Sequence, residues 1–399
     1  MIPLVKSVMA PNALDRVAEV FNSGHITYGS KVAEFEEALR GRIGNPHLAA
    51  LNSGTSGLHL AVRLAADTAR SDGARDRAAR GSGPQGKGAR KTQRATAEGP
   101  GEVLSTPFTF EATNWSILAN GHRIRWVDVD PETLNMDLDD LARKISPATR
   151  AIVIVHWAGY PVDLDRLREI VDEAESANGF RPMIVEDCAH AWGATYRGMP
   201  LGNHGNISVF SFGPNKVLTC GAGGLISLPD DELRRRAVLL RWFGLDRQRA
   251  DPIKYDCDIA EWGYNFYMIE INAAIGHANL EHADWALQRH RENASFYDKE
   301  LVHVPGLEHT ERTDDREPSF YVYPVKVDDR PSFLRKLIDA GIGTVVISRR
   351  NDAHSCMSTS DEALPGLDSI HERVAYVPVG WWLSEEDRAH IVDTIRSGW

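Results

Sequence analysis

A lysine and an acidic residue in this chain have the types and surroundings needed to hold an aldehyde cofactor. Lys216 lies in a loop of small residues, within SVFSFGPNKVLTCGAGGLIS, between two apolar runs typical of buried strands. Asp187 ends an earlier apolar run, in MIVEDCAHAWGA. A lysine amine forms a Schiff base with an aldehyde, and a carboxylate can keep a pyridine nitrogen protonated. Each residue alone is explained as an exposed loop lysine or a strand-end cap. Together they predict pyridoxal phosphate (PLP), with Lys216 and Asp187 as catalytic residues.

The loop Asn52–Gly57 has the composition of an anion site. It reads NSGTSG and precedes a helical pattern. Gly54 lets the backbone approach an anion closely, and Thr55 and Ser56 offer hydroxyl donors. A helix N-terminus adds unpaired N–H groups and a favourable dipole. Because Ser, Gly and Thr are also common helix caps, the loop indicates a phosphate site only in combination with the other residues.

Two further residues could contact a planar cofactor ring. Phe110, in TPFTFEAT, follows a predicted strand and could stack on the pyridine ring, with a core position as the alternative. His190, three residues after Asp187, could donate a hydrogen bond to the phenolic oxygen of the cofactor, or could be an ordinary buried histidine. Both are predicted cofactor-binding residues.

The composition argues against several classes of protein. With 399 residues the chain exceeds a typical single core, so two domains are expected. Its net charge of −11 argues against a nucleic-acid binder, and no apolar run is long enough for a membrane-spanning helix. Four scattered cysteines without a C-x-x-C motif argue against a zinc site and fit a reducing cytoplasm. We therefore expect a cytoplasmic protein with no metal, nucleic-acid or membrane partner.

Apolar periodicity distributes these residues over alternating strands and helices. The helical patterns cover 13–21, 31–40, 56–66, 111–119, 138–145 and 164–176, and the strand-like runs cover 47–51, 102–105, 123–127, 151–155 and 183–185. This alternation predicts an α/β fold with a largely parallel, doubly wound sheet. In such sheets the functional loops follow the carboxyl ends of strands. The segments Asn52–Ser56 and Thr106–Phe110 fall at such ends, as do His156 and Asp187.

The pattern changes near Asp246, where a long helical stretch, Met268–Tyr297, leads into a mixed segment. We predict a large cofactor-binding domain over residues 1–245 and a smaller α+β domain over 246–399. Within the first, Asp67–Gly101 contains nothing more hydrophobic than alanine, and eight Arg or Lys stand against four Asp or Glu. Such a segment cannot bury enough apolar area to fold. We predict a disordered basic insertion there, with contact to an anionic partner as the alternative.

An ordered set of motifs over nearly the whole chain resembles the DegT/DnrJ/EryC1/StrS family of PLP-dependent aminotransferases, often called sugar aminotransferases. The matching segments are SGHITYGSKVAEFEEAL, LNSGTSGLHLAV, STPFTFEATNWSILANGHRIRWVDVDPETLNMD, VHWAGYPVDLD, VEDCAHAWGATYRG, SVFSFGPNKVLTCGAGG and GYNFYMIEINAAIGHANLE. The resemblance implies an aspartate-aminotransferase-like fold (PLP fold type I). It also implies a homodimer with active sites at the subunit interface.

The resemblance also assigns roles to individual residues. Lys216 matches the lysine that bonds the cofactor, Asp187 matches the partner of the pyridine nitrogen, and Phe110 matches the stacking aromatic. Thr55, Ser56 and Ser211 match phosphate ligands, and Asn265 matches an asparagine that reaches the phosphate of the neighbouring subunit. Tyr28 and His354 are candidate substrate contacts, with an exposed loop histidine as the alternative for His354. Trp381 and Trp382, beside a predicted helix cap, are interpreted as packing residues.

The chain departs from the family pattern at two positions near the predicted site. His190 stands where the family often has glutamine, which can donate the same hydrogen bond. Ala222 stands where the family usually has glutamate after the lysine, which removes a carboxylate and weakens inference about the substrate.

We expect amino transfer from glutamate or glutamine to a keto group of a nucleotide-linked deoxysugar. The alternatives are the same chemistry on a cyclitol or another secondary-metabolite carbonyl, a PLP-dependent sugar dehydratase, and a non-catalytic or regulatory protein of the same fold. Family dehydratases carry histidine at the position of Lys216, which argues against the second of these.

Overall fold

The computed structural model describes residues 1–80, 101–247, 256–347, 349–357 and 362–399, with the backbone alone for 69–80. The α-helices are α1 (Ala13–Ser23), α2 (Lys31–Ile43), α3 (Gly54–Arg80), α4 (Glu111–Ala119), α5 (Leu138–Lys144), α6 (Leu164–Asn178), α7 (Asp231–Leu240), α8 (Glu270–Glu300), α9 (Arg330–Asp339), α10 (Pro365–Ile370) and α11 (Glu385–Arg396). The strands are β1 (Leu48–Leu51), β2 (Glu102–Ser105), β3 (Arg123–Trp126), β4 (Thr149–Val155), β5 (Met183–Asp187), β6 (Thr195–Tyr196), β7 (Met199–Pro200), β8 (Ile207–Ser211), β9 (Gly224–Ser227), β10 (Leu307–His309), β11 (Arg316–Glu317), β12 (Tyr323–Val327) and β13 (Val374–Val377).

A seven-stranded sheet in the order β1-β9-β8-β5-β4-β2-β3 forms the centre of the molecule. The pairs β8–β5, β5–β4, β4–β2 and β2–β3 are parallel, whereas β9 is antiparallel to both of its neighbours. The predicted α/β fold with a mainly parallel sheet is therefore confirmed, and β9 is the exception. The loop that carries Lys216 connects β8 to the antiparallel strand β9, so it begins and ends at the same edge of the sheet. The carboxyl ends of the parallel strands lie at this edge too.

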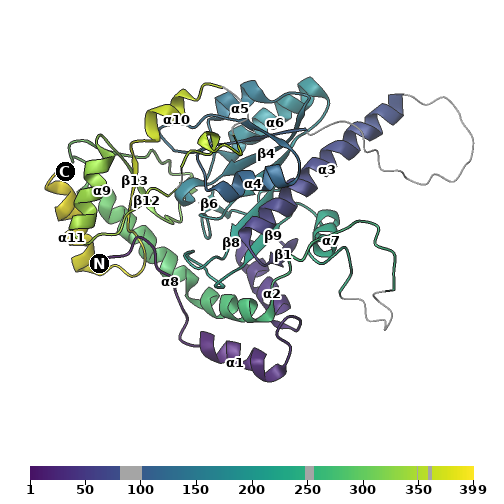
Figure 1. Cartoon of the computed structure of the whole chain (residues 1–399), viewed down its shortest axis with the longest axis horizontal. Coiled ribbons are helices and arrows are strands. Elements are labelled where there is room, and N and C mark those ends of the chain that lie inside the picture. Colours follow the sequence, from purple (N-terminus) through teal and green to yellow (C-terminus); the bar gives the residue numbers. More distant parts are fainter. Residues whose placement is uncertain (81–100, 248–255, 348, 358–361) are drawn as a thin grey trace, which may run out of the picture.

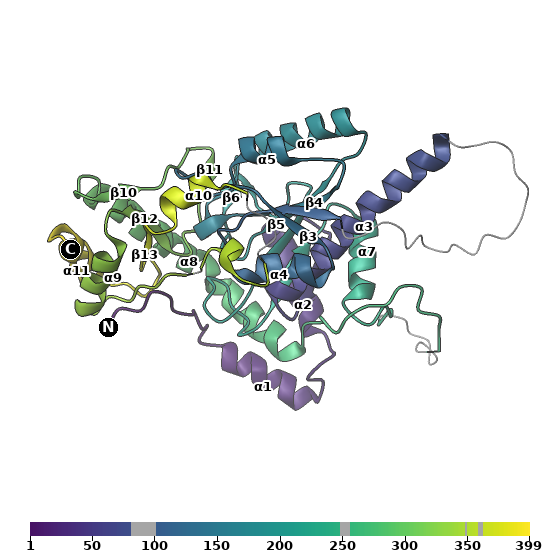
Figure 2. The same cartoon turned by 45° about the horizontal axis from the view of Figure 1, so that its top comes forward.

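Helices cover both faces of this sheet (Figures 1 and 2). Alternate residues of β4 enter two separate cores because successive side chains of a strand point to opposite faces. Ile152 and Ile154 pack in the core that includes residues of α2, α5, α6 and α8, whereas Val153 packs in the core formed with α3, α4 and α7. The continuous apolar sequence of β4 follows from this burial on both sides.

A second, three-stranded antiparallel sheet, in the order β10-β12-β13, lies in the C-terminal part. Helices α9 and α11 share a core with it, and Figure 1 shows α8 running from the large sheet into this region. Ala273 and Leu280 of α8 pack on the large sheet, whereas Tyr297 packs in the C-terminal core. The proposed boundary near residue 245 precedes residues 248–255, which are outside the described residues, so it stays a prediction.

Helix α3 is longer than the apolar pattern indicated. The prediction ended it near Ala66 and began a disordered insertion at Asp67, but the helix continues to Arg80. Residues 67–80 are rich in alanine and arginine, which favour helix, and contain no proline. The Asp67 carboxylate also forms an ion pair with Arg236 of α7, which ties the extension to its neighbour. The prediction of disorder was therefore wrong for 67–80, and its remainder at 81–100 lies outside the described residues.

No helix in the described ranges is both long and apolar enough to cross a membrane.

Candidate active site

A cavity of about 390 Å³ opens where β1, β2, β5 and β8 end. Seven of the predicted site residues line it: Gly54, Thr55, Phe110, Asp187, His190, Ser211 and Lys216. They come from four separate loops, and the topology of the parallel sheet brings these loops together. The structure thus assembles most of the predicted site in one place.

Lys216 presents a buried amine to this cavity. Its Nζ lies 4.3 Å from the centroid of the Tyr321 ring, and among the described residues it makes no hydrogen bond or ion pair. Burial lowers the pKa of Lys216 from 10.5 to about 8, while the nearby Asp187 charge opposes that shift. A substantial fraction of the amine is therefore neutral and nucleophilic near physiological pH.

Asp187 is the last residue of β5, and its carboxylate is held on two sides. The Thr113 hydroxyl donates to Oδ2 at 2.7 Å, and the Ala189 N–H donates to Oδ1 at 3.0 Å. Burial raises the pKa of Asp187, while these hydrogen bonds and the charge of Lys216 act in the opposite direction. The prediction did not include Thr113. Thr113 is 74 residues from Asp187 in the sequence, so no local pattern indicates a contact that joins the ends of two different strands.

The N-terminus of α3 lies against Ser211, as an anion site requires. A Cβ atom added at Gly54 would lie 2.8 Å from the Ser211 Cβ, so only glycine fits this close approach. The Ser53 hydroxyl accepts the Ser56 N–H at 3.0 Å and caps the helix, and it also contacts the Ser56 hydroxyl at 2.9 Å. Ser56 is therefore engaged in the cap and is not among the lining residues, unlike Gly54, Thr55 and Ser211.

Three rings line the cavity. Phe110 is 52% exposed, so it is a cavity residue and not a core residue. His190 stacks on Tyr321, with ring centroids 4.3 Å apart and planes at 15°. Burial, together with the charge of Lys216, holds the pKa of His190 well below its usual range, so the ring is neutral. Its Nδ1 is buried and has no hydrogen-bond partner in the described ranges. Sequence reasoning missed Tyr321, since only its tertiary position beside Lys216 and His190 distinguishes it.

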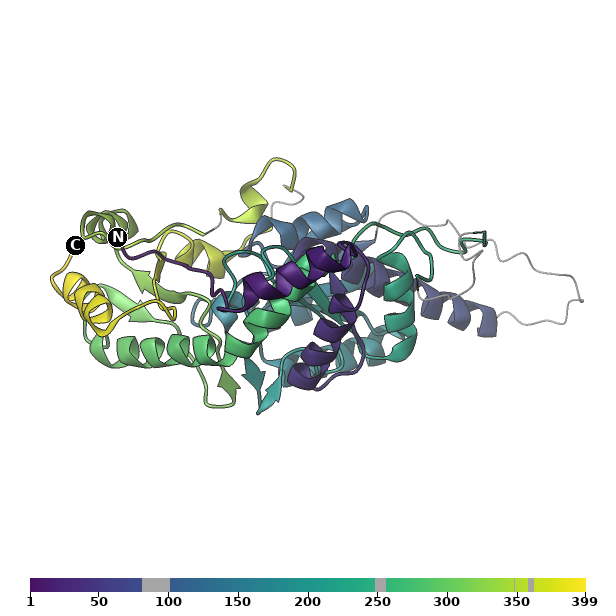
Figure 3. The ribbon, with the colours of Figure 1, turned by 90° about the horizontal axis from the view of Figure 1, so that it is seen from below.

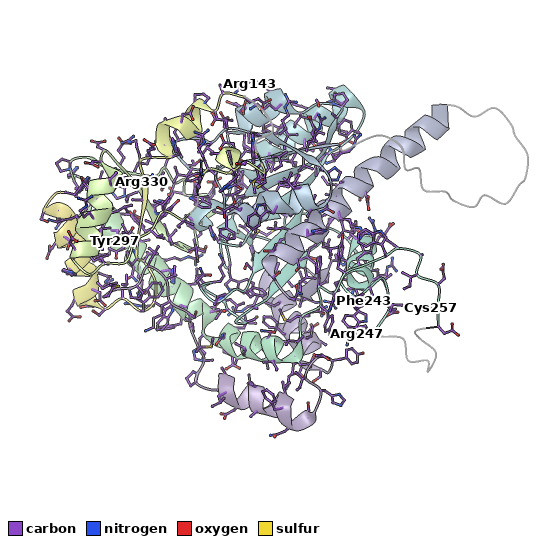
Figure 4. All side chains as sticks on the ribbon, in the orientation of Figure 1. Arg143, Phe243, Arg247, Cys257, Tyr297 and Arg330 are labelled. Carbon is purple, nitrogen blue, oxygen red and sulfur yellow. The ribbon has the colours of Figure 1, made fainter. Side chains whose placement is uncertain are left out.

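Four residues singled out in the sequence lie outside the cavity. The Asn265 side chain is exposed, and its backbone carbonyl accepts a hydrogen bond from the Asn52 amide at 3.2 Å. Tyr28 donates to the Arg247 carbonyl at 3.2 Å, and Figure 4 shows Arg247 near Phe243, far from Tyr297 of the C-terminal part. His354 Nε2 lies 3.5 Å from Glu111 Oε1. Ala222 is exposed and is not among the residues that line this cavity.

A buried pair, His156 and Glu186, lies at the ends of β4 and β5 next to Asp187. The Val162 N–H donates to His156 Nδ1 at 3.0 Å, so Nε2 carries the ring proton and donates to Glu186 at 2.9 Å. Asn206 donates to the other Glu186 oxygen at 2.7 Å. The Cys188 thiol is close enough to complete a metal-ligand set. These hydrogen bonds account for the polar atoms of the pair without an ion, and the role of the pair is to join the two strand ends.

The chain matches the profile of the DegT/DnrJ/EryC1/StrS aminotransferase family over residues 8–72 and 92–396. It is similar to the sugar aminotransferase CalS13 from Micromonospora echinospora, with 57% identity, a TM-score of 0.90 and 100% of each chain covered. AtS13 from Actinomadura melliaura is 59% identical, with a TM-score of 0.89 over 100% of this chain and 99% of that one. The UDP-4-amino-4,6-dideoxy-N-acetyl-beta-L-altrosamine transaminase of Campylobacter jejuni is 27% identical, over 96% of this chain and 94% of the relative. The chain therefore belongs to the DegT/DnrJ/EryC1/StrS aminotransferase family and is a PLP-dependent transaminase.

Proposed function

We propose that the protein transfers an amino group from glutamate or glutamine to the keto group of a nucleotide-linked deoxysugar. The observation that carries this proposal is the single cavity lined by the Lys216 amine, the Asp187 carboxylate and the N-terminus of α3. The names of two relatives support the substrate class. CalS13 is described as a sugar aminotransferase, and the Campylobacter jejuni relative is named for a UDP-linked amino sugar.

The lining residues fit PLP. A volume of about 390 Å³ falls within the usual range for small-molecule sites. The cavity offers an amine that has no hydrogen bond or ion pair within the described part of the chain, a fixed carboxylate and an anion site at a helix N-terminus. When bound, PLP supplies an aldehyde carbon that takes up the amino group and a pyridine ring that accepts electrons.

Each lining residue then has a role in holding the group. We assign the aldehyde carbon to Lys216 Nζ and the protonated pyridine nitrogen to the Asp187 carboxylate. The phosphate is assigned to the N–H groups and hydroxyls of Gly54, Thr55 and Ser211, which line the cavity, whereas Ser56, which the resemblance also assigned to it, is engaged in the helix cap. Phe110 stacks on the ring, and His190 donates to the phenolic oxygen. The partner subunit's Asn265 reaches the phosphate, which completes the site across a homodimer.

Lys216 also has the acidity needed to move protons during the reaction. A general base works best when its pKa is close to the working pH, and burial brings the pKa of Lys216 to about 8. In the first half of the reaction its neutral amine would take the proton from the α-carbon of the amino donor, and in the second half its ammonium form would deliver a proton to the former keto carbon of the acceptor. The Asp187 carboxylate, held by the Thr113 hydroxyl and the Ala189 N–H, would pair with the protonated pyridine nitrogen.

The test is a screen of acceptors against enzyme loaded with pyridoxamine phosphate. UDP- and dTDP-linked keto-deoxysugars are added in turn, together with a cyclitol ketone, and the visible absorbance of the aldehyde form is followed. We expect this absorbance to return with a nucleotide-linked keto-deoxysugar. Its return with the cyclitol ketone alone would contradict the sugar assignment and leave transamination intact.

The Lys216→Arg variant tests the assignment of the lysine. It keeps the positive charge but cannot form the covalent bond, so we expect folded protein without turnover. Turnover close to that of the wild-type enzyme would show that another residue performs this step.

A further inference from the structure

The segment Ile2–Ser7, here called the N-terminal strap, forms one wall of the cavity. Leu4 and Val5 line the cavity, together with residues 345–347. Val345 and Val346 are 51% and 43% exposed, so an apolar surface remains accessible beside the strap. The rest of the lining is mixed, with apolar residues such as Leu58, Val155 and Val322 beside the polar site residues.

The backbone of the strap is joined to the C-terminal part. The Ile2 N–H donates to the Gly341 carbonyl at 2.8 Å, and the Gly343 N–H donates to the Ile2 carbonyl at 2.7 Å. A Cβ atom at Gly343 would lie 2.8 Å from both the Ile2 oxygen and the Leu4 nitrogen. This close approach requires glycine, so the strap has a fixed position beside residues 341–343.

Two neighbouring tryptophans bond the strap on either side of Leu4 and Val5. Trp382 Nε1 donates to the Pro3 carbonyl at 3.0 Å, and Trp381 Nε1 donates to the Lys6 carbonyl at 3.2 Å. The Lys6 ammonium lies over the Trp381 ring, 5.3 Å from its centroid. The sequence indicated packing for both indoles. In the structure they are also donors to the two carbonyls that flank the cavity wall.

The other end of the strap is joined to the lysine loop. The Ser7 hydroxyl donates to the Pro214 carbonyl, two residues before Lys216. Figure 3 shows the strap as a purple segment that runs from the C-terminal part towards α1. The strap thus connects the tryptophans of the C-terminal part to the loop that carries the catalytic amine.

We propose that Trp381 and Trp382 are positioning residues for substrate recognition, because they hold Leu4 and Val5 against the acceptor. An apolar wall favours deoxygenated carbons, whereas a hydroxyl pressed against it would lose its hydrogen bonds to water. The wall therefore fits the deoxygenated face of a deoxysugar. This part of the inference rests on the proposed function, whereas the attachment of the strap by the indoles does not.

The attachment is tested by proteolysis of the holoenzyme with endoproteinase Lys-C, followed by mass spectrometry of the cleavage after Lys6. Trp381→Phe keeps an aromatic ring but removes the indole N–H that donates to the Lys6 carbonyl. This carbonyl belongs to the peptide bond that the protease cleaves. We expect cleavage after Lys6 to become about fivefold faster, the factor for one neutral hydrogen bond. Trp399→Phe is the matched control, because the Trp399 indole packs on Phe333 in the C-terminal core.

The recognition is tested with dTDP-4-keto-6-deoxyglucose as the acceptor in steady-state kinetics. In the Trp381→Phe/Trp382→Phe double variant we expect the acceptor KM to rise at least fivefold, since two such hydrogen bonds are lost. We expect kcat to stay within about twofold, because the lysine and its acid are untouched. The visible absorbance of bound PLP should be unchanged.

The outcomes separate the two parts of the inference. Unchanged cleavage after Lys6 in Trp381→Phe and in the double variant would overturn the attachment of the strap by the indoles. Faster cleavage with an unchanged acceptor KM would overturn the role in recognition. If the wild-type enzyme accepts no keto-sugar, the proposed function fails, and the cleavage rates still decide the attachment.

Discussion

Asp187 is held by a chain of two hydroxyl groups at the start of α4. The Thr109 and Thr113 hydroxyls are 2.8 Å apart, and Thr113 lies 2.7 Å from Asp187 Oδ2. An ionised carboxylate only accepts hydrogen bonds, so Thr113 donates to Asp187 and accepts from Thr109. This bond counteracts the burial that raises the pKa of Asp187. Thr113 thus helps to keep the carboxylate ionised and oriented.

Replacing Thr113 with valine should weaken the hold on PLP. The variant keeps the shape of the side chain but removes a hydrogen bond to a charged group, which contributes about 1.5 kcal/mol or more. We expect the dissociation constant for PLP to rise about tenfold, measured by absorbance titration.

The loss of PLP affinity should be greater at lower pH. Without the Thr113 hydrogen bond the pKa of Asp187 rises further, so its carboxylate takes up a proton at a higher pH. Ser116→Ala is the control, since this buried hydroxyl lies on the same helix and donates to the Thr113 carbonyl at 2.6 Å. Equal PLP affinity in both variants would contradict the role of Thr113.

The lowered pKa of Lys216 predicts how the rate of PLP addition to the apoenzyme depends on pH. The ammonium form cannot attack an aldehyde, so loading requires the neutral amine. Because burial lowers the pKa of Lys216 to about 8, the rate of PLP addition to apoenzyme should rise with pH and level off above 8. At pH 7 about one-tenth of the amine is neutral, so the rate should be about one-tenth of the plateau. The rate is followed by absorbance, with Lys216→Arg as the unreactive control. A midpoint near 10.5, the ordinary value for lysine, would contradict the burial of the amine.

Among the larger elements, residues 349–357 are held against the loop after β2 by Asn351. This side chain is fully buried, donates to the Thr109 carbonyl at 2.8 Å and accepts from the Asn114 amide at 2.8 Å. Its own N–H donates to the Pro107 carbonyl at 2.9 Å. Val345 and Val346, which line the cavity beside the strap, precede this segment in the chain.

Replacing Asn351 with alanine should loosen this segment. The substitution removes one hydrogen bond each from the buried Thr109 carbonyl and the buried Asn114 amide, at a cost of about 2 kcal/mol. We expect the melting temperature of the holoenzyme to fall by a few degrees in a thermal scan. Ser355→Ala, at an exposed position of the same segment, serves as the control and should melt with the wild-type protein. An unchanged melting temperature for Asn351→Ala would mean that the hydrogen bonds of the Asn351 side chain contribute nothing to stability.

Local sequence patterns predicted the elements better than the contacts between them. The predicted bounds of α4, Glu111–Ala119, agree with the structure, and the predicted strand ends carry the cavity residues. Periodicity could not reveal that β9 is antiparallel, because both strand directions have the same apolar pattern. It also gave no sign of Tyr321 or of the strap, whose positions depend on pairings between distant segments. The prediction ended helix α3 too early because residues 67–80 have helical propensity but no apolar stripe.

For the whole molecule, the position of Asn265 bears on its assembly. Its side chain is exposed and lies outside the cavity formed by its own chain. The family resemblance assigns this residue to the phosphate, so the assignment requires a second copy of the chain. A C2 dimer satisfies this requirement in both sites at once, because each subunit lends the same residue to the other. Each active site would then contain Lys216 from one subunit and Asn265 from its partner.

Mixing two defective variants tests this arrangement directly. Lys216→Arg removes the reacting amine, and Asn265→Asp places a second negative charge beside the phosphate, so each variant alone should have little activity. In a mixed dimer, one site combines the intact Lys216 of one chain with the partner subunit's intact Asn265. Random co-refolding gives half mixed dimers with one working site in two, so about a quarter of the wild-type activity should return. If Asn265 served the cavity of its own chain, every site in the mixture would carry a defect and no activity would be regained. With an affinity tag on one variant, native mass spectrometry resolves the mixed dimer from the two homodimers, and wild-type enzyme refolded in the same way gives the recoverable activity. A failure to regain activity in a mixture that contains mixed dimers then counts against the shared site and not against refolding.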